Sequence, residues 1–525
     1  MSRAASDSIA APAPVRRVGD DPAAPASAAP AQRMARTRRW AWRRLRGDLW
    51  DDVGSLTVIV PLPHDAERVR QLTTTLEAVD ADIRAQRSPL REVRGLHVAR
   101  WVVLPERVRG RGALTQPSLV MWVVHDGDRA AHLRELTHKA RSVLDQVYAH
   151  CDGYPGAGAP GAAVARFLTD HEAHGRVASY VGTPGVSVDS IRLQRRLVEE
   201  ELVPLARELR MQQLPNHHVF LAMQDFVTGR SARPFKDPAL REFASRRPGT
   251  RKLPWLYLDL IWNLLRSRNT LRAVVVLGTA LTAFANWWHL DTGFAGGLAF
   301  VAVGAAGLAA LALTVFGFGL RNAEKREAMR YIRASDRELR DHDDRLARRD
   351  NEGPGMNRVT IVTDLKPGLT RQITLRFVLW LVAFRAGRNF EGSLEGIETI
   401  HFAQWRIVDG GRRLLFMSNY DGQALDYFRE FAENSAPGVN AIWGNTEGMP
   451  NTTAVIGEGS RNLEEFQNAA RVHQIPTDAW YCGYADRRFL TVAINDNWRI
   501  HRLLHEHPTP SQVDEWMTLL ERYGV

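Results

Sequence analysis

The spacing of hydrophobic positions predicts strands where it is close to two residues and helices where it is close to 3.6. Read this way, the chain contains the same order of elements twice, strand–helix–strand–strand–helix–strand. This is the split βαβ order of ferredoxin-like folds, and it predicts an α+β protein with two tandem ferredoxin-like (βαββαβ) domains. The expected elements of the first copy are 56–62, 65–83, 97–104, 119–124, 133–148 and 177–188. Those of the second copy are 359–362, 370–386, 401–408, 413–418, 424–433 and 481–494.

Matching motifs indicate that the two copies arose by internal duplication. The pattern [Leu/Ile]-His-x-Ala-x-Trp is centred on His97 in the first copy and on His401 in the second. Each is followed by an apolar run that ends in Asp-Gly, at Asp126 and Asp421. A glycine lies 27 positions after each of these aspartates, and Tyr180 and Tyr481 lie in similar short motifs further on.

Two long stretches without formal charge, 273–290 and 294–320, separate the copies. Uncharged stretches of 18 and 27 residues are long enough to cross a bilayer as helices. Arginine and lysine flank both outer ends, which by the positive-inside rule places both termini in the cytoplasm. The sequence therefore predicts a two-helix transmembrane hairpin in a multi-pass protein of the inner (plasma) membrane. A buried helical hairpin is the alternative.

The composition along the chain gives the expected domain boundaries. We expect a disordered tail at 1–35, because that stretch is rich in Ala, Pro, Ser and Arg and poor in large apolar residues. The first ferredoxin-like domain is expected at 50–240 and the second at 357–525. Between them we expect an interfacial helix with the hairpin at 253–320, then a charged linker helix at 321–350.

The net charge of +10 is compatible with a lipid surface, with nucleic acid or with an arginine-rich composition. Much of the excess flanks the apolar stretches, and no nucleic-acid-binding module is evident, so the expected partner is a lipid bilayer and not nucleic acid. The two cysteines, Cys151 and Cys482, have no metal-binding spacing, and clustered histidines such as His217 and His218 are weak signals, so no metal is predicted.

The candidate catalytic residues are the pairs that recur at equal places: His97, His401, Asp126, Asp421, Tyr180 and Tyr481. A histidine could ligate haem iron or move a proton, and a carboxylate at a sheet edge could act as acid or base. Structural roles are the alternative for each: a strand histidine bonded to backbone, an aspartate capping the next helix, and a buried tyrosine. Trp101 and Trp405 are expected in the core.

The duplicated halves, the paired His-x-Ala-x-Trp strands and the Asp-Gly after the third strand resemble the dimeric α+β-barrel superfamily. That superfamily includes the dye-decolourising haem peroxidases, so the resemblance implies haem as a candidate cofactor. The peroxidase motif Gly-x-x-Asp-Gly has Val123 and Ser418 in place of its first glycine in the two copies.

Two functions follow as hypotheses, and the sequence does not decide whether the chain is an enzyme. In the first, duplicated cytoplasmic domains anchored at the membrane bind a small hydrophobic ligand or a partner without catalysis. In the alternative, the chain is a membrane-bound, haem-dependent, peroxidase-like oxidoreductase. Homo-oligomerisation is left open.

Overall fold

The computed structural model divides the chain into a unit of residues 1–46 and a unit of residues 47–525. The residues that it describes all lie in the larger unit. They are 53–106, 116–173, 177–184, 186–228, 314, 316–326, 355–386, 393–484, 490–504 and 509–525. We call residues 53–228 the first half and residues 355–525 the second half.

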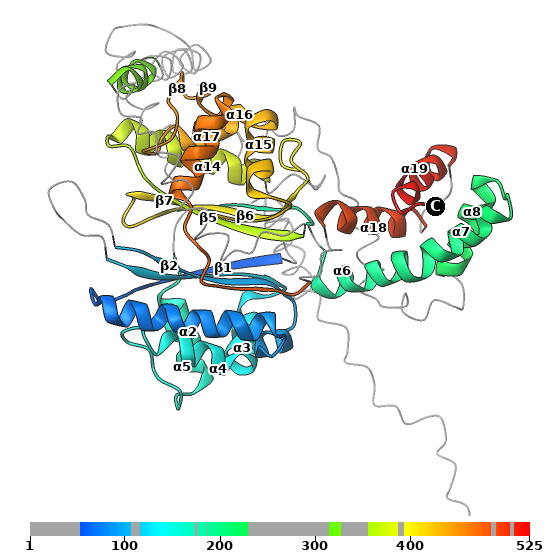
Figure 1. Cartoon of the computed structure of the whole chain (residues 1–525), viewed down its shortest axis with the longest axis horizontal. Helices are drawn as coiled ribbons and strands as arrows, with labels where there is room; N and C mark the ends of the chain where they lie inside the picture. The colour runs from blue at the N-terminus through cyan, green and yellow to red at the C-terminus, as the bar shows by residue number, and fades with distance from the viewer. Residues whose placement is uncertain are drawn as a thin grey trace, which may run out of the picture. The chain divides into compact units, whose positions relative to one another are not determined.

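The first half contributes three antiparallel strands, β1 (Val53–Pro61), β2 (Leu96–Leu104) and β3 (Ser118–Asp126). Four α-helices and a short 3₁₀ turn, η1 (Pro89–Glu92), accompany one face of this sheet (Figure 1). The helices are α2 (Ala66–Arg84), α3 (Arg129–Lys139), α4 (Arg141–Tyr148) and α5 (Gly161–Asp170). Helix α2 begins at Asp65, whose carboxylate accepts from the amide of Glu67, as N-caps do.

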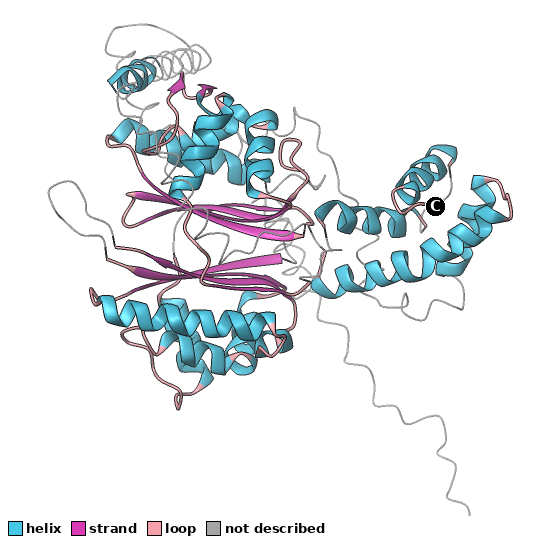
Figure 2. Ribbon diagram, in the orientation of Figure 1, coloured by secondary structure: helices cyan, strands magenta, loops and turns pink. Residues whose placement is uncertain are grey.

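The second half repeats this order. Strands β5 (Met356–Asp364), β6 (Ile400–Val408) and β7 (Arg413–Asp421) are antiparallel. Helices α14 (Leu369–Ala386), α15 (Ala424–Asn434), α16 (Ala436–Trp443) and α17 (Leu463–His473) cover the outer face of their sheet (Figure 2). Between α16 and α17 lie a two-stranded ribbon, β8 (Thr452–Thr453) with β9 (Gly457–Glu458), and the 3₁₀ turn η4 (Gly459–Arg461).

The fourth strand of each half belongs to the sheet of the other half. Strand β4 (Val177–Val181) pairs with β6, and strand β10 (Ala479–Cys482) pairs with β2. The two four-stranded sheets are therefore β1-β3-β2-β10 and β4-β6-β7-β5. This corrects the expectation of two self-contained βαββαβ domains, because neither half completes its own sheet.

The inner faces of the two sheets share one apolar core. Because side chains alternate across a strand, the outer residues of β2, such as Trp101, pack with the helices, and the inner ones, such as Val102, meet the other sheet. Val102 belongs to a core cluster that includes Phe402 and Met417 of the second half. Helices outside and sheets face to face inside are visible in Figure 2.

Helices that follow the exchanged strands form a third core from both halves. The first half contributes α6 (Val188–Arg195), the π-helical turn η2 (Arg196–Leu202), α7 (Val203–Met211) and α8 (Asn216–Thr228). The second half contributes α18 (Thr491–Leu503) and α19 (Pro510–Glu521). Phe220 of α8 packs edge-to-face against Trp516 of α19, with ring centroids 5.2 Å apart.

The predicted transmembrane hairpin is not supported. Among the residues described, no helix combines the length and the apolar character that crossing a bilayer requires. Helix α14 is long enough but carries Arg371, Arg376 and Arg385. The assignment of a multi-pass inner-membrane location with both termini in the cytoplasm loses its structural basis and is withdrawn.

Most of the predicted hairpin, 273–313, lies outside the described residues, as do the predicted tail at 1–35, the expected interfacial helix and residues 327–350 of the linker. The end of the second predicted span belongs to a described helix, residues 316–326. Glu324 on that helix accepts hydrogen bonds from Thr452 Oγ1 and from the amides of Ala454 and Val455. The helix that contains the end of the predicted span is therefore held against the second half by Glu324, which belongs to the expected linker.

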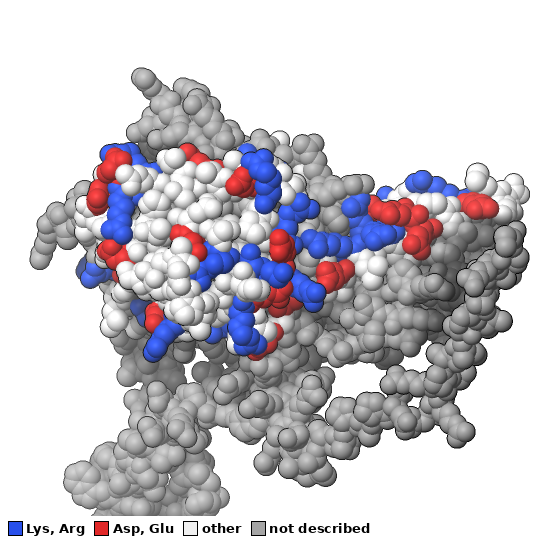
Figure 3. Space-filling model, turned by 90° about the horizontal axis from the view of Figure 1, so that it is seen from below, with Lys and Arg blue, Asp and Glu red and all other residues white. Residues whose placement is uncertain are grey.

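On the face shown in Figure 3, acidic and basic side chains are interspersed where the chain is described. Helix α2 of the first half carries ion pairs of this kind: its Arg68 pairs with Asp152, in the turn after α4, at 2.9 Å, and its Arg84 pairs with Asp80 at 2.6 Å. The net positive charge is thus not gathered into one basic track on the described part of this face.

Candidate functional site

His97 and Asp126 form a buried pair in the first half. The register between β2 and β3 shifts between Leu96 and Val98, which makes His97 the extra residue of a bulge. Bulges turn a side chain away from the regular alternation of a strand. The His97 ring is fully buried, and its Nε2 lies 2.8 Å from Asp126 Oδ1.

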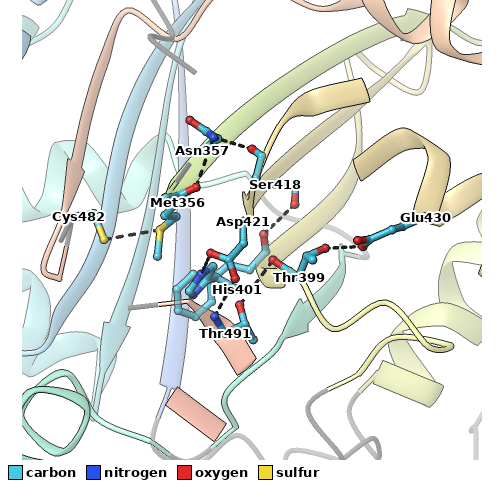
Figure 4. Close-up of polar contacts among 12 residues, drawn as sticks. Met356, Asn357, Thr399, His401, Ser418, Asp421, Glu430, Cys482 and Thr491 are labelled. Atoms are coloured by element: carbon cyan, nitrogen blue, oxygen red, sulfur yellow. Dashed lines mark hydrogen bonds and ion pairs between the residues drawn. The ribbon is translucent and has the colours of Figure 1, made fainter. Parts of the chain in front are cut away.

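His401 and Asp421 repeat this arrangement in the second half (Figure 4). The register of β6 against β7 shifts at the same place, between Ile400 and Phe402. His401 Nε2 lies 2.6 Å from Asp421 Oδ1, and this ring is also fully buried. The sequence correctly singled out both pairs as equivalent positions, although it did not place each histidine against its aspartate.

The second oxygen of each aspartate binds the start of a helix. The amide of Val188 donates to Asp126 Oδ2 at 2.9 Å, and the amide of Thr491 donates to Asp421 Oδ2 at 2.7 Å. Val188 and Thr491 are the first residues of α6 and α18. A helix N-terminus favours negative charge, so each carboxylate suits a charged form that accepts from the imidazole.

Each site is completed by the other half of the chain. The amide of Gly483, after exchanged strand β10, donates to His97 O, and the amide of Gly182, after exchanged strand β4, donates to His401 O, both at 2.8 Å. An added Cβ would lie 2.4 Å from Leu96 O at Gly483 and 1.9 Å from Ile400 O at Gly182. Glycine is therefore needed at both places where the strands cross over.

The two sites differ at the remaining ring nitrogen. Tyr484 OH lies 3.0 Å from His97 Nδ1, with the two rings nearly perpendicular at 88°. In the second half, His401 Nδ1 is buried and has no hydrogen-bond partner within the described parts of the chain. The residue after Gly182 is Thr183, and its buried hydroxyl likewise lacks a partner there.

These contacts show which nitrogen of each imidazole carries a proton. A charged carboxylate only accepts, so Nε2 is the donor in both pairs, and in a neutral ring Nδ1 is then an acceptor. Tyr484 can donate to His97 Nδ1. The second half leaves an acceptor of the same kind unsatisfied, and a buried unpaired acceptor is costly to folding.

The other two candidates, Tyr180 and Tyr481, are not part of these pairs. Tyr180 packs in the helix-side core of the second sheet, and Tyr481 packs in that of the first sheet. Burial raises the pKa of both hydroxyls. The structure thus gives them the packing role that was the alternative for each.

The sequence did not single out the residues that distinguish the two sites, Thr183 and Tyr484. Both directly follow the glycine of the motif that ends at Gly182 in one copy and at Gly483 in the other. In both copies the residue that distinguishes the sites therefore lies one position after the motif. Its meaning depends on the exchange of β4 and β10, which the spacing of apolar residues does not reveal.

A second recurring pair lies behind the aspartates. His125 and His132 stack in parallel with centroids 4.1 Å apart, and Tyr420 and Tyr427 do the same at the equivalent places. Burial lowers the pKa of His132 to about 3 and also lowers that of His125. Both histidines are thereby held neutral beside Asp126.

The two histidines differ in what they could offer a metal ion. His97 has both ring nitrogens engaged, whereas His401 has only Nε2 held by Asp421 and keeps Nδ1 unpartnered among the described residues. No group of three or more residues able to hold a metal ion occurs within the described ranges. Two further clustered histidines near the C-terminus, His505 and His507, lie outside those ranges.

A small apolar pocket lies on the helix side of the second sheet, away from the His–Asp pairs. It is lined by Ile361, Phe416, Phe428, Phe431, Trp443, Met449, Phe466 and Ala470. These side chains offer no strong hydrogen-bonding group to orient a ligand. The pocket is therefore a weaker candidate than the unsatisfied imidazole of His401.

Comparisons of the chain with protein-family models, with curated proteins and with solved structures found no match. The chemistry of the site therefore has to be argued from its own geometry.

Proposed function

We propose that this chain binds a small neutral ligand through the imidazole of His401. The observation that carries the proposal is the unsatisfied His401 Nδ1, fully buried in a pair whose counterpart in the first half is fully satisfied. A ligand with a hydrogen-bond donor would remove the cost of that unpaired acceptor.

The surroundings of His401 determine which ligands suit it. An anion offers acceptors, and Nδ1 of the neutral ring is itself an acceptor because Asp421 holds the proton-bearing Nε2, so the two would not pair. The ring centroids of Phe402 and Tyr484 lie 6.5 and 6.3 Å from that of His401. A neutral molecule with one donor and an apolar body fits both features, in keeping with the hydrophobic ligand expected from sequence.

The first half has a supporting role in this proposal. Tyr484 occupies the acceptor of His97 with a group from the chain itself, so this pair is closed to a ligand. The first-half site thus has a hydrogen-bond donor supplied by the protein itself, and the second-half site has none among the described residues. Because both Nε2 atoms are held by aspartate, the haem-dependent alternative would have to use His401 Nδ1, the same atom that the proposed ligand binds.

The test is a screen of small neutral hydrogen-bond donors against the full chain, read as the rise in melting temperature on binding. The key variant is His401→Gln, whose amide can replace Nε2 as the donor to Asp421 but provides no group at Nδ1. His97→Gln is the matched control in the first half. We expect at least one compound to stabilise the wild-type chain and the control but not His401→Gln.

Failure of every compound to distinguish His401→Gln from His97→Gln would overturn the proposal. A compound that stabilises all three proteins equally counts against it too, because its binding would not depend on the imidazole. Circular dichroism of each variant establishes that the comparison is made between folded proteins.

A further inference from the structure

We propose that the ligand of His401 is a phenol, because the chain uses a phenol to satisfy the equivalent histidine. The inference rests on the proposed function and narrows it to one chemical class. It depends on the correspondence of Thr183 with Tyr484, on how Tyr484 binds His97, and on the groups around His401.

Thr183 and Tyr484 hold corresponding positions in the two sites. Each follows the glycine whose amide donates to the histidine carbonyl, and both of those bonds are 2.8 Å long. The strands before them pair in the same sense, with Tyr180 opposite Ala403 and Tyr481 opposite Ala99. The residue after each glycine therefore holds the same place in the two halves, and in the first half its side chain binds the histidine.

Tyr484 shows which interactions a phenol makes with this pair. Its hydroxyl lies 3.0 Å from His97 Nδ1, and the rings meet edge to face with centroids 5.7 Å apart. Burial raises the pKa of this hydroxyl, so it stays protonated and remains a donor. The phenol thus donates a hydrogen bond and adds an aromatic contact of favourable geometry.

The second-half site offers the complementary groups. His401 Nδ1 can accept from a hydroxyl, and the hydroxyl of Thr183, at the position that corresponds to Tyr484, is also buried and unpartnered among the described residues. Threonine is shorter than tyrosine and brings no ring of its own. The rings of Phe402 and Tyr484 beside His401 favour an aromatic body over an aliphatic one.

The experiment titrates p-cresol, the side chain of tyrosine as a free molecule, into the full chain and measures the dissociation constant by calorimetry. We expect binding to the wild type and at least tenfold weaker binding to His401→Gln. Toluene lacks the hydroxyl and 4-methylcyclohexanol lacks the aromatic ring, so both are expected to bind at least fivefold more weakly than p-cresol. Equal binding of 4-methylcyclohexanol would overturn the aromatic part of the inference.

Two further variants make the result decisive. Thr183→Tyr supplies the phenol covalently and should abolish p-cresol binding at His401. Tyr484→Gly removes the phenol from His97 and should create a second p-cresol site of similar affinity. Unchanged binding by Thr183→Tyr would place the ligand elsewhere and overturn the inference.

The outcomes separate the two proposals. If p-cresol binds only to Tyr484→Gly, the assay detects a phenol on a His–Asp pair and the inference for His401 is wrong. The proposed function then survives only if another donor binds in a His401-dependent way. If Tyr484→Gly does not fold, the wild-type, His401→Gln and Thr183→Tyr titrations still decide the inference.

Discussion

The guanidinium of Arg100 donates to the hydroxyl of Thr360 at 3.2 Å, across the two sheets and 260 residues away in sequence. The equivalent contact on the other side runs from Thr57 Oγ1 to Gln404 Oε1 at 3.1 Å. Arginine and glutamine thus occupy the same motif position in the two halves, and each meets the threonine of the opposing edge strand. This reciprocity is what a fused pair of two-fold-related units would show.

The Arg100 contacts predict a large stability effect. Its guanidinium is fully buried and also donates to Val359 O and Ser418 O, so removing it leaves several acceptors unpaired. We expect Arg100→Met to lower the free energy of unfolding by about 3 kcal/mol, measured by urea denaturation. Arg68→Met, which removes a partly exposed ion pair with Asp152, should cost less than about 1 kcal/mol. Equal losses in the two variants would contradict this account.

The glycines that follow the exchanged strands give a second prediction. At Gly182 and Gly483 an added Cβ would meet a backbone carbonyl oxygen, which has no flexible end to move aside. We expect alanine at either position to lower the free energy of unfolding by about 2 kcal/mol or more. Gly158→Ala is the control, since a methyl group added there would have no atom within 4 Å and the chain needs no left-handed backbone at that position.

Measurement of all three alanine variants by urea denaturation checks this. If Gly182→Ala and Gly483→Ala are as stable as Gly158→Ala, the two glycines do not lie as close to the carbonyl oxygens of Ile400 and Leu96 as the structure places them. A loss at only one of the two would mean that the halves are less alike at this place than their geometry indicates.

The exchange of β4 and β10 also predicts that the two halves hold together without a covalent connection. Both exchanged strands, the core between the sheets and the third core join residues of the two halves. A protease site inserted after residue 240 allows the full chain to fold first and be cut afterwards. We expect the two fragments to co-elute in size-exclusion chromatography and to separate only in denaturant. Separation in native buffer would contradict this prediction.

Local patterns in the sequence were enough to predict most strands and helices within each half. The alternation in β2 and β6 and the helical spacing in α2 are local properties, and they follow from which residues must be buried. The equal offsets of His97 with His401 and of Asp126 with Asp421 pointed to the residues that form the two pairs. The spacing of apolar residues does not reveal the bulges that turn each histidine toward its aspartate.

Long-range pairing was the part that sequence could not supply. A strand such as β10 carries the same apolar pattern whether it completes its own sheet or the other one. The same limit applies to α14, since the sequence does not show that its apolar residues Leu369, Ile373 and Phe377 are exposed. The predicted hairpin rested on the length of two uncharged stretches and on their basic flanks, and the described helices give it no support.

The stacked pair His125 and His132 predicts how stability depends on pH. Burial lowers the pKa of both rings, that of His132 to about 3, whereas the ordinary value is 6.5. Between pH 6.5 and 3 the ring of His132 therefore binds more protons in the unfolded state than in the folded state, so its contribution to the free energy of unfolding falls as the pH falls, and His125 acts in the same direction. The slope from each ring is at most about 1.4 kcal/mol per pH unit.

His132→Phe keeps an aromatic ring on His125 but removes the group that titrates. We expect this variant to lose less stability than the wild type between pH 6.5 and pH 4.5, measured by urea denaturation at each pH. His138→Gln, which removes an exposed histidine on the same helix, should leave the wild-type dependence unchanged. If His132→Phe loses as much stability as the wild type over this range, His132 is not held neutral by burial, and the acid sensitivity has another source.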